Sequence, residues 1–505
     1  MNQIKDLTSG NIFSQIIKLA IPIIATSFVQ MAYNMTDMAW LGQVGSETVS
    51  AVGIALYLVW FGASLLFITK IGAEVGISQS IGSKNLERAQ SFAKNAFSLS
   101  FIISIAFALC VWIFAEPIID LFKINSDFVN GTAFRYLRII AIGMPFTFSN
   151  ITMSGIYNGV GNTKTSFWIN AFGLIINMIL DPILIFGWGS IPAMGAEGAG
   201  IATVISQLAV FLVFLYYLYI KENPLQLKNY IGKIQKEFFI PILKVGGPVA
   251  VQSAWFAFIA MILARVINDI ADGDSIPFSV QSIGSQIEAL SWMTASGFST
   301  ALGTFTGQNF GANKWGRIQK GFFITLGIAG FIGLISTLLF LFVGEPIFGL
   351  FINNSENNVV KMGMVYLFIL GISQVFMCVE ITATGAFNGI GRANPPAIVG
   401  IIGNILRIPI AYLLSYTLVD YLPLFQNWIS PESVSATGVW WGLTITSILK
   451  GSILFLWFVA LLYKHPENNT PLPLQRFWIR IIPNRLRQTS IIINPLDNEE
   501  FKTRA

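Results

Sequence analysis

Charged side chains are scarce in this chain. Only 11% of its 505 residues are Asp, Glu, Lys or Arg, whereas 54% are hydrophobic. Soluble domains carry roughly twice that share of charge, and a chain this apolar could not keep its surface away from water. The composition therefore excludes an ordinary water-soluble globule and predicts an integral membrane protein, with the lipid bilayer as a partner.

Cysteine and histidine are also nearly absent. The two cysteines, Cys110 and Cys378, lie in hydrophobic segments, and the single histidine, His465, follows the last of these segments. These counts exclude a disulfide framework, a cysteine metal site and a histidine proton relay within the membrane. The chain also lacks the G-x-x-x-x-G-K-[ST] motif that cradles nucleotide phosphates. We therefore expect no cofactor, no nucleotide partner and no step driven by ATP.

Long hydrophobic stretches are what the chain has in abundance. About 20 apolar residues span a bilayer as a helix. Stretches of sufficient length occur at 16–42, 50–80, 93–115, 132–157, 165–187, 198–220, 238–268, 276–305, 318–343, 359–387, 395–418 and 436–463. The sequence therefore predicts an all-α integral membrane protein with twelve transmembrane helices.

Lysine and arginine are distributed unequally between the loops. If the N-terminus is cytoplasmic, the outer segments keep only Lys123 and Lys361, with Arg135, Arg138 and Arg265 near the outer helix ends. Inner loops of membrane proteins carry such an excess of basic residues. With an even number of helices, this bias predicts two cytoplasmic termini in a multi-pass protein of the cell inner membrane. The basic residues are spread over several loops, so we expect no nucleic-acid partner.

The chain contains an internal repeat at an offset of about 229 residues. This offset superimposes the strings AEPIIDLF and GEPIFGLF, and a shift of one residue superimposes GIYNGVGNT (155–163) on GAFNGIGRA (385–393). Further pairs are Gln79 with Gln308, Gly82 with Gly311, Arg88 with Arg317, Gln90 with Gln319, Asn177 with Asn404, and Pro182 with Pro409. Because the matches keep their order, they indicate a duplication rather than chance similarity between apolar helices.

The duplication predicts two lobes. Six helices per unit is an even number, so both units enter the membrane from the same side and the repeat is parallel. Parallel two-lobe repeats are typical of secondary transporters, whose lobes rock around a central cavity. We expect an N-terminal lobe over 1–220, a cytoplasmic linker over 221–237, a C-terminal lobe over 238–465 and a polar cytoplasmic tail over 466–505.

Four oxygen-bearing side chains of the N-terminal lobe converge at one depth. Asp37 lies about five residues, or roughly 8 Å, below the outer end of the first helix, and Asp181 lies at a similar depth on the fifth. Asn177 stacks one turn deeper on the same face, and Thr203 reaches this level from the sixth helix. Charge at membrane depth indicates function, and these oxygens suit Na⁺ or a proton shared by the two acids. The structural alternative is a pair of capped polar residues near the interface, with Pro182 only kinking its helix.

The second lobe supplies residues for a substrate cavity. Glu288 and Glu380 could attract a cationic substrate, although hydrogen-bonded structural roles are an equal alternative. Trp255 and Trp292 could stack on a planar substrate. The predicted cavity set is Gln30, Gln252, Trp255, Glu288, Trp292 and Glu380. This set favours an organic, cationic or amphipathic substrate.

The motifs together resemble those of the multidrug and toxic compound extrusion (MATE) family. The resemblance covers about residues 10–465 and rests on an ordered set of segments rather than on any single one. The set is Pro22 and Gln30, Asp37 followed by WLGQVG, SQSIGSKNLERA at 78–89, GIYNGVGNTK at 155–164, Asn177 with Asp181-Pro182, and GQNFGANK at 307–314.

The resemblance implies two six-helix lobes in a V shape, and an antiporter that exports organic compounds as protons or sodium ions flow inward. It implies that Asp37, Asn177, Asp181 and Thr203 form the cation site, and that the first helix bends around Pro22. One segment departs from the family pattern. Where other branches carry an acid in the seventh helix, this chain has GGPVAVQSAW with Gln252 near that place. Glu288 could replace that acid.

Two other functions fit parts of the sequence. A flippase for lipid-linked saccharides shares the broader architecture, but it would need many cationic cavity residues, and only Arg407 and Lys450 are available. An intramembrane aspartyl protease would use Asp37 and Asp181, but Asp181 stands in ILDP rather than in a glycine-flanked motif. We therefore predict a transporter that is not an enzyme and that works as a monomer on small organic substrates.

Overall fold

Helices make up almost all of the regular structure. The computed structural model describes residues 4–120, 126–218, 225, 232–271, 276–349, 357–417 and 436–464. Within these ranges the only extended pairing is an isolated bridge between Trp188 and Ile191. The predicted tail 466–505 and most of the predicted linker 221–237 lie outside the described residues.

The first lobe consists of six long helices. They are α1 (Ile12–Val44), α2 (Ser46–Gly82), α3 (Leu86–Asp120), α4 (Asp127–Gly159), α5 (Thr163–Phe186) and α6 (Gly195–Tyr216). The second lobe consists of α7 (Lys236–Ile270), α8 (Ile276–Gly311), α9 (Trp315–Phe342), the short α10 (Gly344–Gly349), α11 (Asn357–Gly371), α12 (Gln374–Gly389), α13 (Asn394–Thr417) and α16 (Thr437–Leu462).

The helices coincide with the twelve predicted stretches. Among the described residues, nine helices are long and apolar enough to span a bilayer, and α11 with α12 makes a tenth span bent by 51°. The remaining two, α2 and α8, have 37 and 36 residues and pack among the others. The prediction of an all-α membrane protein with twelve helices in two lobes is confirmed.

The stretch 359–387 differs from the prediction because it is broken. The break falls between Gly371 and Gln374. The carbonyl of Gly371 accepts a hydrogen bond from the Thr337 hydroxyl (2.6 Å), and the Ser373 hydroxyl donates to the carbonyl of Leu370 (3.0 Å). Gly371 and Ser373 are separated by a single residue, and nearby Gly and Ser residues with side-chain bonds to the backbone are a common cause of helix kinks. Composition alone does not reveal such a kink.

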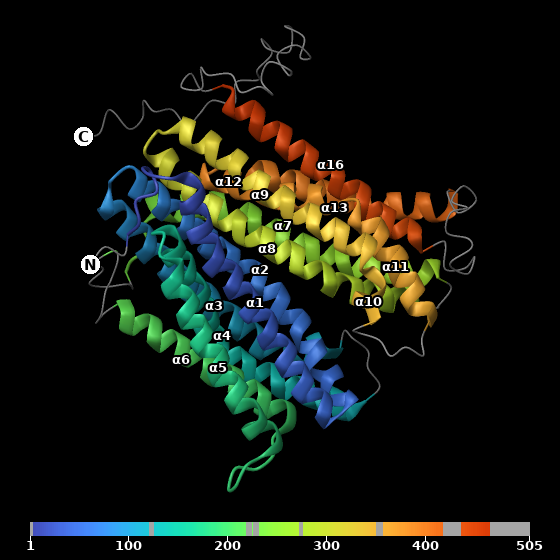
Figure 1. The fold of residues 1–505 in the computed structure, drawn as a ribbon. Coiled ribbons are helices and arrows are strands. Elements are labelled where there is room, and N and C mark those ends of the chain that lie inside the picture. The colour runs from blue at the N-terminus through green and yellow to red at the C-terminus, as the bar shows by residue number, and fades with distance from the viewer. Residues whose placement is uncertain are drawn as a thin grey trace.

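Equivalent helices of the two lobes make equivalent contacts. Figure 1 shows them as two inclined bundles, α1–α6 in blue to green and α7–α16 in yellow-green to red. The first helix of each lobe packs on the fifth spanning helix of its own lobe and on the second helix of the other: α1 on α5 and α8, and α7 on α13 and α2. The helices α2 and α8 also contact each other. This reciprocal pattern is what a duplicated, parallel repeat requires.

The repeated loops have the same backbone in both lobes. Gly161 and Gly391 have φ values of 81° and 77°, a region that favours glycine. Each donates its N–H to the carbonyl of an Asn three residues earlier, at 2.8 Å in both lobes. Lys84 and Asn313, the residues at equivalent places after α2 and α8, have φ values of 60° and 57°. The predicted tight turns are therefore present twice.

The lobes touch closely at one end of the molecule. A Cβ on Gly82 of α2 would collide with the backbone of Gln308 on α8, and a Cβ on Gly311 of α8 would collide with the backbone of Gln79 on α2. The Gln79 amide also donates to the carbonyl of Gly389 at 2.9 Å. Glycine at these two positions therefore permits a backbone-to-backbone crossing that closes this end.

The N-terminal segment reinforces the closed end. The Lys5 N–H donates to the carbonyl of Val160 in the first lobe (3.1 Å), and the Leu7 N–H donates to Gln308 Oε1 in the second (2.9 Å). Arg317 donates to the carbonyls of residues 7, 9 and 10. Hydrogen bonds from Thr8 and Ser9 hold the pKa of Asp6 below its ordinary value, so its carboxylate keeps this turn ordered at neutral pH.

The lobes separate towards the other end. One hydrophobic cluster joins the first half of α1, including Ile16 and Ala20, to the second half of α8, including Phe298 and Leu302. The clusters at the opposite end do not cross between lobes: one contains residues 41–199 only, and another contains residues 259–440 only. The molecule is therefore V-shaped, closed at the end that carries residues 4–10.

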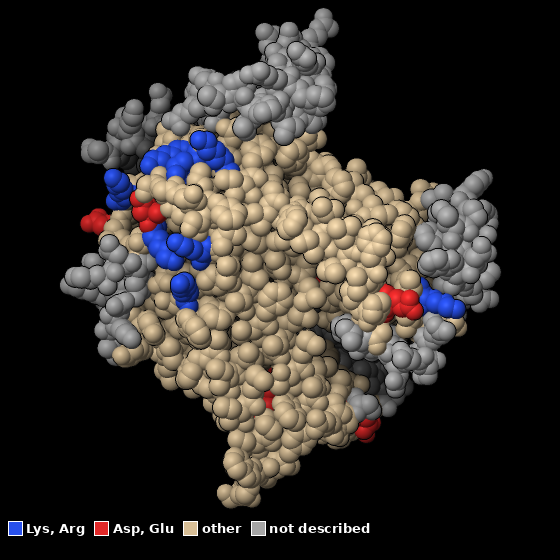
Figure 2. All heavy atoms as spheres, viewed as in Figure 1, with Lys and Arg blue, Asp and Glu red and all other residues tan. Residues whose placement is uncertain are grey.

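Charge follows the same division. Figure 2 shows Lys and Arg gathered at the closed end, and a broad surface almost free of charge beside it. Lys5 lies near Lys164 and Lys18 there, and Lys314 donates to the carbonyl of Thr8 (2.9 Å). An uncharged belt flanked by charged ends is what a bilayer-spanning protein requires.

Candidate functional site

A carboxylate and an amide are stacked on α5. Asn177 and Asp181 are four residues apart, so they share one face of the helix. Both are fully buried, and Asn177 Nδ2 donates to Asp181 Oδ1 at 3.0 Å. Pro182 follows directly within the helix, and its ring nitrogen removes the hydrogen bond to the carbonyl of Met178. The helix thus presents two buried oxygen-bearing side chains beside a locally weakened backbone.

The second acid comes from α1. Because α1 packs along α5, Asp37 reaches the same level as Asp181, and the two carboxyl groups lie within hydrogen-bonding reach of each other. A hydrogen bond between two carboxyl groups requires a proton on one of them. The structure therefore brings together the two acids that the sequence placed at one depth.

A hydroxyl pair lines the same site. Thr203 of α6 accepts a hydrogen bond from the phenol of Tyr33 at 2.8 Å. Tyr33 lies one helical turn before Asp37, and a buried phenol from α4, Tyr136, lies close enough to interact electrostatically with both acids. The sequence analysis missed both tyrosines. The spacing of four between Tyr33 and Asp37 is the signal that would have identified the first.

Three oxygens of the site are without a partner. Asp37 Oδ1, Asn177 Oδ1 and Asp181 Oδ2 are buried and accept no hydrogen bond within the described part of the chain. Buried polar atoms are usually satisfied, so unsatisfied ones on neighbouring residues indicate room for a ligand. Two carboxyl groups, an amide and a hydroxyl suit a hard cation or a proton. The described residues contain no group of three or more His, Cys, Asp or Glu for a softer metal.

The remaining predicted residues lie elsewhere. Gln30 on α1 is exposed, and the Trp292 side chain on α8 is 41% exposed. Gln252 on α7 lies against Gly400 of α13. Trp255 is partly buried against the core of the second lobe, and its indole nitrogen has no partner among the described residues. The structure does not bring these residues together with the four of the first-lobe site.

The acids of the second lobe are held by hydrogen bonds and cations. Glu288 accepts hydrogen bonds from Tyr366 (3.0 Å) and Gln374 (2.7 Å). Glu380 forms a buried ion pair with Lys450, with Nζ and Oε1 2.9 Å apart. Lys450 also donates to Asn404 Oδ1 at 3.4 Å. Every acid in this cluster therefore has a partner.

Arg407 completes the cluster in the second lobe. Its Nε donates to the Thr446 hydroxyl at 3.2 Å, and its guanidinium lies 5.9 Å from the ring centre of Phe256. It also lies near enough to Glu288 and Glu380 to interact with both carboxylates. The two cations and two acids thus balance one another in charge.

Known proteins match this chain over most of its length. The MatE family model matches residues 22–183 and 248–413, once in each lobe. A probable multidrug resistance protein NorM of Thermotoga maritima is 28% identical over 454 residues, which cover 88% of this chain and 92% of that protein.

Solved structures have the same fold. A crystal structure of a MATE protein in complex with MaD3S is 22% identical, with a TM-score of 0.80 over 91% of this chain and 98% of that one. An outward-facing multidrug resistance MATE family transporter of the MOP superfamily is 22% identical, with a TM-score of 0.77 over 91% and 97%. The two matches of the family model cover well over half of the sequence, and this chain therefore belongs to the MatE family of multi-pass membrane transporters, not to the enzymes.

Proposed function

We propose that this transporter is a secondary antiporter that exports small organic compounds in exchange for protons or sodium ions. The observation that carries the proposal is the pair Asp37 and Asp181, in which each acid keeps one buried unpartnered oxygen, beside a third from Asn177. A site of this kind can hold one monovalent cation or one proton. The ion site would therefore be where the transmembrane ion gradient does work on the protein.

The position of the pair favours ion entry from the open end of the V. Asp37 lies seven residues before the end of α1, about 10 Å along the helix axis. The other end of α1 packs in the interlobe cluster. One helix thus connects the ion site to the contact that must open when the lobes rock. An ion that binds better in one state than in the other shifts the equilibrium between them by that difference in affinity.

Pro22 supplies a place for α1 to bend. It lies inside a continuous helix, and its ring nitrogen leaves the carbonyl of Lys18 without the usual donor. The Thr26 hydroxyl donates to the carbonyl of Pro22 at 2.9 Å. Ile24, two residues after Pro22, packs against Gly297 of the other lobe. Ile16 and Ala20, before Pro22, pack in the interlobe cluster. A bend at Pro22 would therefore move the part of α1 that carries Asp37 relative to the part before Pro22.

We further propose that the closed, Lys- and Arg-rich end is cytoplasmic, in the inner membrane, and that the protein acts as a monomer. The excess of basic residues at that end supports this orientation. Both described ends of the chain, Ile4 and Lys464, then lie on the cytoplasmic side. In this proposed orientation, the space between the lobes opens outward.

Organic cations and amphipathic molecules are the substrates we propose. Such substrates suit the aromatic residues of the second lobe and the acids Glu288 and Glu380. Both acids have partners within the protein, with which a cationic substrate would compete. A lipid-linked saccharide needs free cations for its pyrophosphate. Arg407 and Lys450 are engaged with Thr446, Glu380 and Asn404, so neither of these two cations favours the flippase function.

Efflux from proteoliposomes tests the proposal. The purified protein is reconstituted with a fluorescent lipophilic cation such as 4′,6-diamidino-2-phenylindole, and a proton or a sodium gradient is imposed separately. We expect gradient-driven transport under at least one of the two, which names the ion. Asp37→Asn should abolish it, because the amide cannot exchange a proton or neutralise a cation.

Two controls make the outcome decisive. Insertion and folding of Asp37→Asn are checked by gel filtration and by the temperature midpoint of unfolding, which should match the wild type. Normal gradient-driven efflux by a folded Asp37→Asn variant would contradict the proposed site. Equal transport with and without any gradient would contradict antiport itself.

A further inference from the structure

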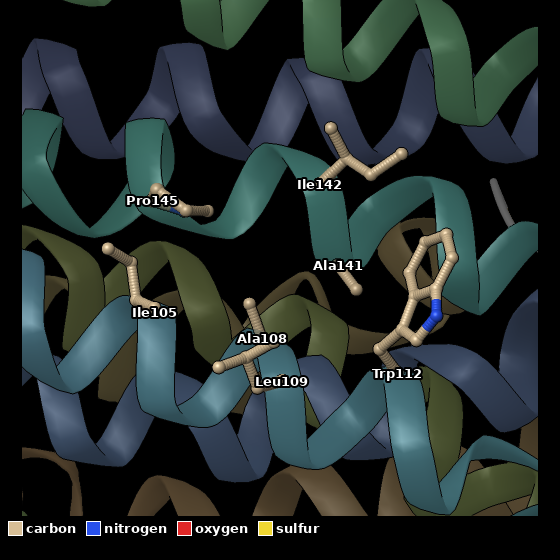
Figure 3. A pocket seen from close by; sticks show the side chains of 7 residues that line it. All are labelled: Ile105, Ala108, Leu109, Trp112, Ala141, Ile142 and Pro145. Atoms are coloured by element: carbon tan, nitrogen blue, oxygen red, sulfur yellow. The ribbon is translucent and has the colours of Figure 1, made fainter.

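A groove runs between α3 and α4 on the outside of the first lobe. Its volume is about 210 Å³, and its lining is apolar: Ile105, Ala108, Leu109, Trp112, Ala141, Ile142 and Pro145. Figure 3 shows the α3 side chains facing Ala141 and Pro145 of α4 across it. Leu109 and Ile142 are each 56% exposed within apolar spans, so the groove faces the lipid and not the ion site.

A single arginine lies beside the groove. The guanidinium of Arg138 on α4 is 5.0 Å from the ring centre of Trp112, which lines the groove, and 4.3 Å from that of Phe134. Its Nε is buried and has no hydrogen-bond partner, and the side chain makes no ion pair within the described residues. A positive charge in this position lacks the anion that buried or half-buried arginines normally have.

The neighbouring arginine shows the contrast. Arg135, three residues earlier on α4, forms an ion pair with Glu197 of α6. Glu116, the nearest acid in sequence to Trp112 on α3, is exposed and forms no ion pair with Arg138. Within the described part of the first lobe, Arg135 thus has an internal anion and Arg138 has none.

The depth of Arg138 suits a lipid headgroup. The helix α4 has 33 residues, or about 50 Å, which exceeds a hydrocarbon core of about 30 Å by roughly 10 Å at each end. Arg138 lies eleven residues from the start of α4, about 16 Å along it. Its long side chain reaches back to the boundary between hydrocarbon and headgroups, where phosphates are found.

We propose that the groove binds one acyl chain of an anionic phospholipid, whose phosphate is held by Arg138. Arginine donates two parallel hydrogen bonds to a phosphate, and contacts with the rings of Trp112 and Phe134 hold the guanidinium beside the groove. A zwitterionic lipid offers the same phosphate, but its ammonium group opposes the arginine charge. The site therefore prefers lipids with net negative charge, such as phosphatidylglycerol.

Quenching of Trp112 by brominated lipids tests the site. The detergent-solubilised protein is titrated with phosphatidylglycerol or with phosphatidylcholine, each carrying bromine on the acyl chain. The chain has 13 tryptophans, so the signal of Trp112 is the difference between the wild type and Trp112→Phe. We expect half-maximal quenching at about fivefold less phosphatidylglycerol than phosphatidylcholine, the preference that one basic residue near a membrane surface confers.

Two variants separate the headgroup from the groove. Arg138→Gln should remove the preference for phosphatidylglycerol, whereas the matched control Arg135→Gln should retain it. Ala108→Phe fills the groove and should weaken quenching by both lipids. Gel filtration shows that each variant is folded before it is titrated.

Three results would overturn the proposal. They are equal quenching by the two lipids in the wild type, the same loss of preference in Arg135→Gln as in Arg138→Gln, and unchanged quenching in a folded Ala108→Phe variant. The assay requires no transport, so its outcome is independent of the proposed antiport function.

Discussion

The two lobes have the same scaffold but opposite electrostatics at equivalent places. Asn177 in the first lobe and Asn404 in the second occupy matched positions of the repeat, each followed by a proline five residues later. In the first lobe, Asn177 donates to Asp181. In the second, Ile408 replaces the acid, and Asn404 accepts from Lys450 instead.

This difference between the lobes indicates which of them can bind a coupling ion. In the first lobe, Asp37 and Asp181 each keep one unpartnered oxygen, and so does Asn177, so the proposed site can exchange a proton or a cation. The acids of the second lobe are already bound by Lys450, Tyr366 and Gln374, so a new cation must displace an internal partner. Among the described residues, a buried pair of acids with unpartnered oxygens occurs at this place in the first lobe and not in the second.

The largest effect on transport is expected from a variant that breaks the pair Asp37 and Asp181. Asp181→Asn should reduce gradient-driven efflux at least about tenfold, since it removes one of the two groups that share the ion. Glu288→Gln in the second lobe should leave the dependence on the gradient intact. The initial rate of efflux from proteoliposomes measures both, and equal losses in the two variants would contradict a single coupling site.

The free energy of unfolding should depend more on the second-lobe acids than on the first-lobe pair. Lys450→Met leaves the buried carboxylate of Glu380 without its cation, which should lower the free energy of unfolding by about 3 to 5 kcal/mol. The double variant Lys450→Met/Glu380→Gln should recover most of that loss. Thermal unfolding of the detergent-solubilised protein measures it, and a single variant as stable as the wild type would show that the ion pair has no structural role.

A smaller effect is expected from Tyr33, and it tests whether this residue belongs to the ion site. Tyr33→Phe removes the hydrogen bond to Thr203 (2.8 Å), and a loss of about 1 kcal/mol corresponds to roughly fivefold in ion affinity. The concentration of the coupling ion that gives half-maximal efflux should rise by that factor. An unchanged value would place Tyr33 outside the site.

The smallest effect comes from a buried tyrosine of the second lobe. Tyr366→Phe removes the donor to Glu288 (3.0 Å) but should not alter the dependence of efflux on ion concentration. Its measurable consequence is a decrease of a few degrees in the unfolding midpoint. A shift in ion dependence similar to that of Tyr33→Phe would extend the coupling site into the second lobe.

Periodic and repeated features were predictable from the sequence. Apolar length predicted the twelve spans, and the ordered repeat predicted two lobes, because both are properties of the linear chain. The depth of Asp37 and Asp181 followed from a count of residues along two helices. The match between this depth and the observed contact reflects how strictly a bilayer fixes helix length and direction.

Side-chain partners were not predictable in the same way. The ion pair of Glu380 with Lys450 joins α12 to α16, 70 residues apart in sequence, and only tertiary packing brings them together. Tyr136 and the bend after Gly371 were missed for the same reason. The hydrogen bonds between residues 4–10 and α8 join positions about 300 residues apart, and no local pattern marks them.

The most direct test of the first-lobe site counts protons. In weakly buffered detergent solution, addition of NaCl or of the transported cation should release about one proton per chain, because in the proposed site the two acids share a single proton. A pH-sensitive dye measures the release. We predict the same release from wild type and Glu288→Gln, and none from Asp37→Asn or Asp181→Asn; release that persists in Asp181→Asn, or is lost in Glu288→Gln, would contradict a coupling site confined to the first lobe.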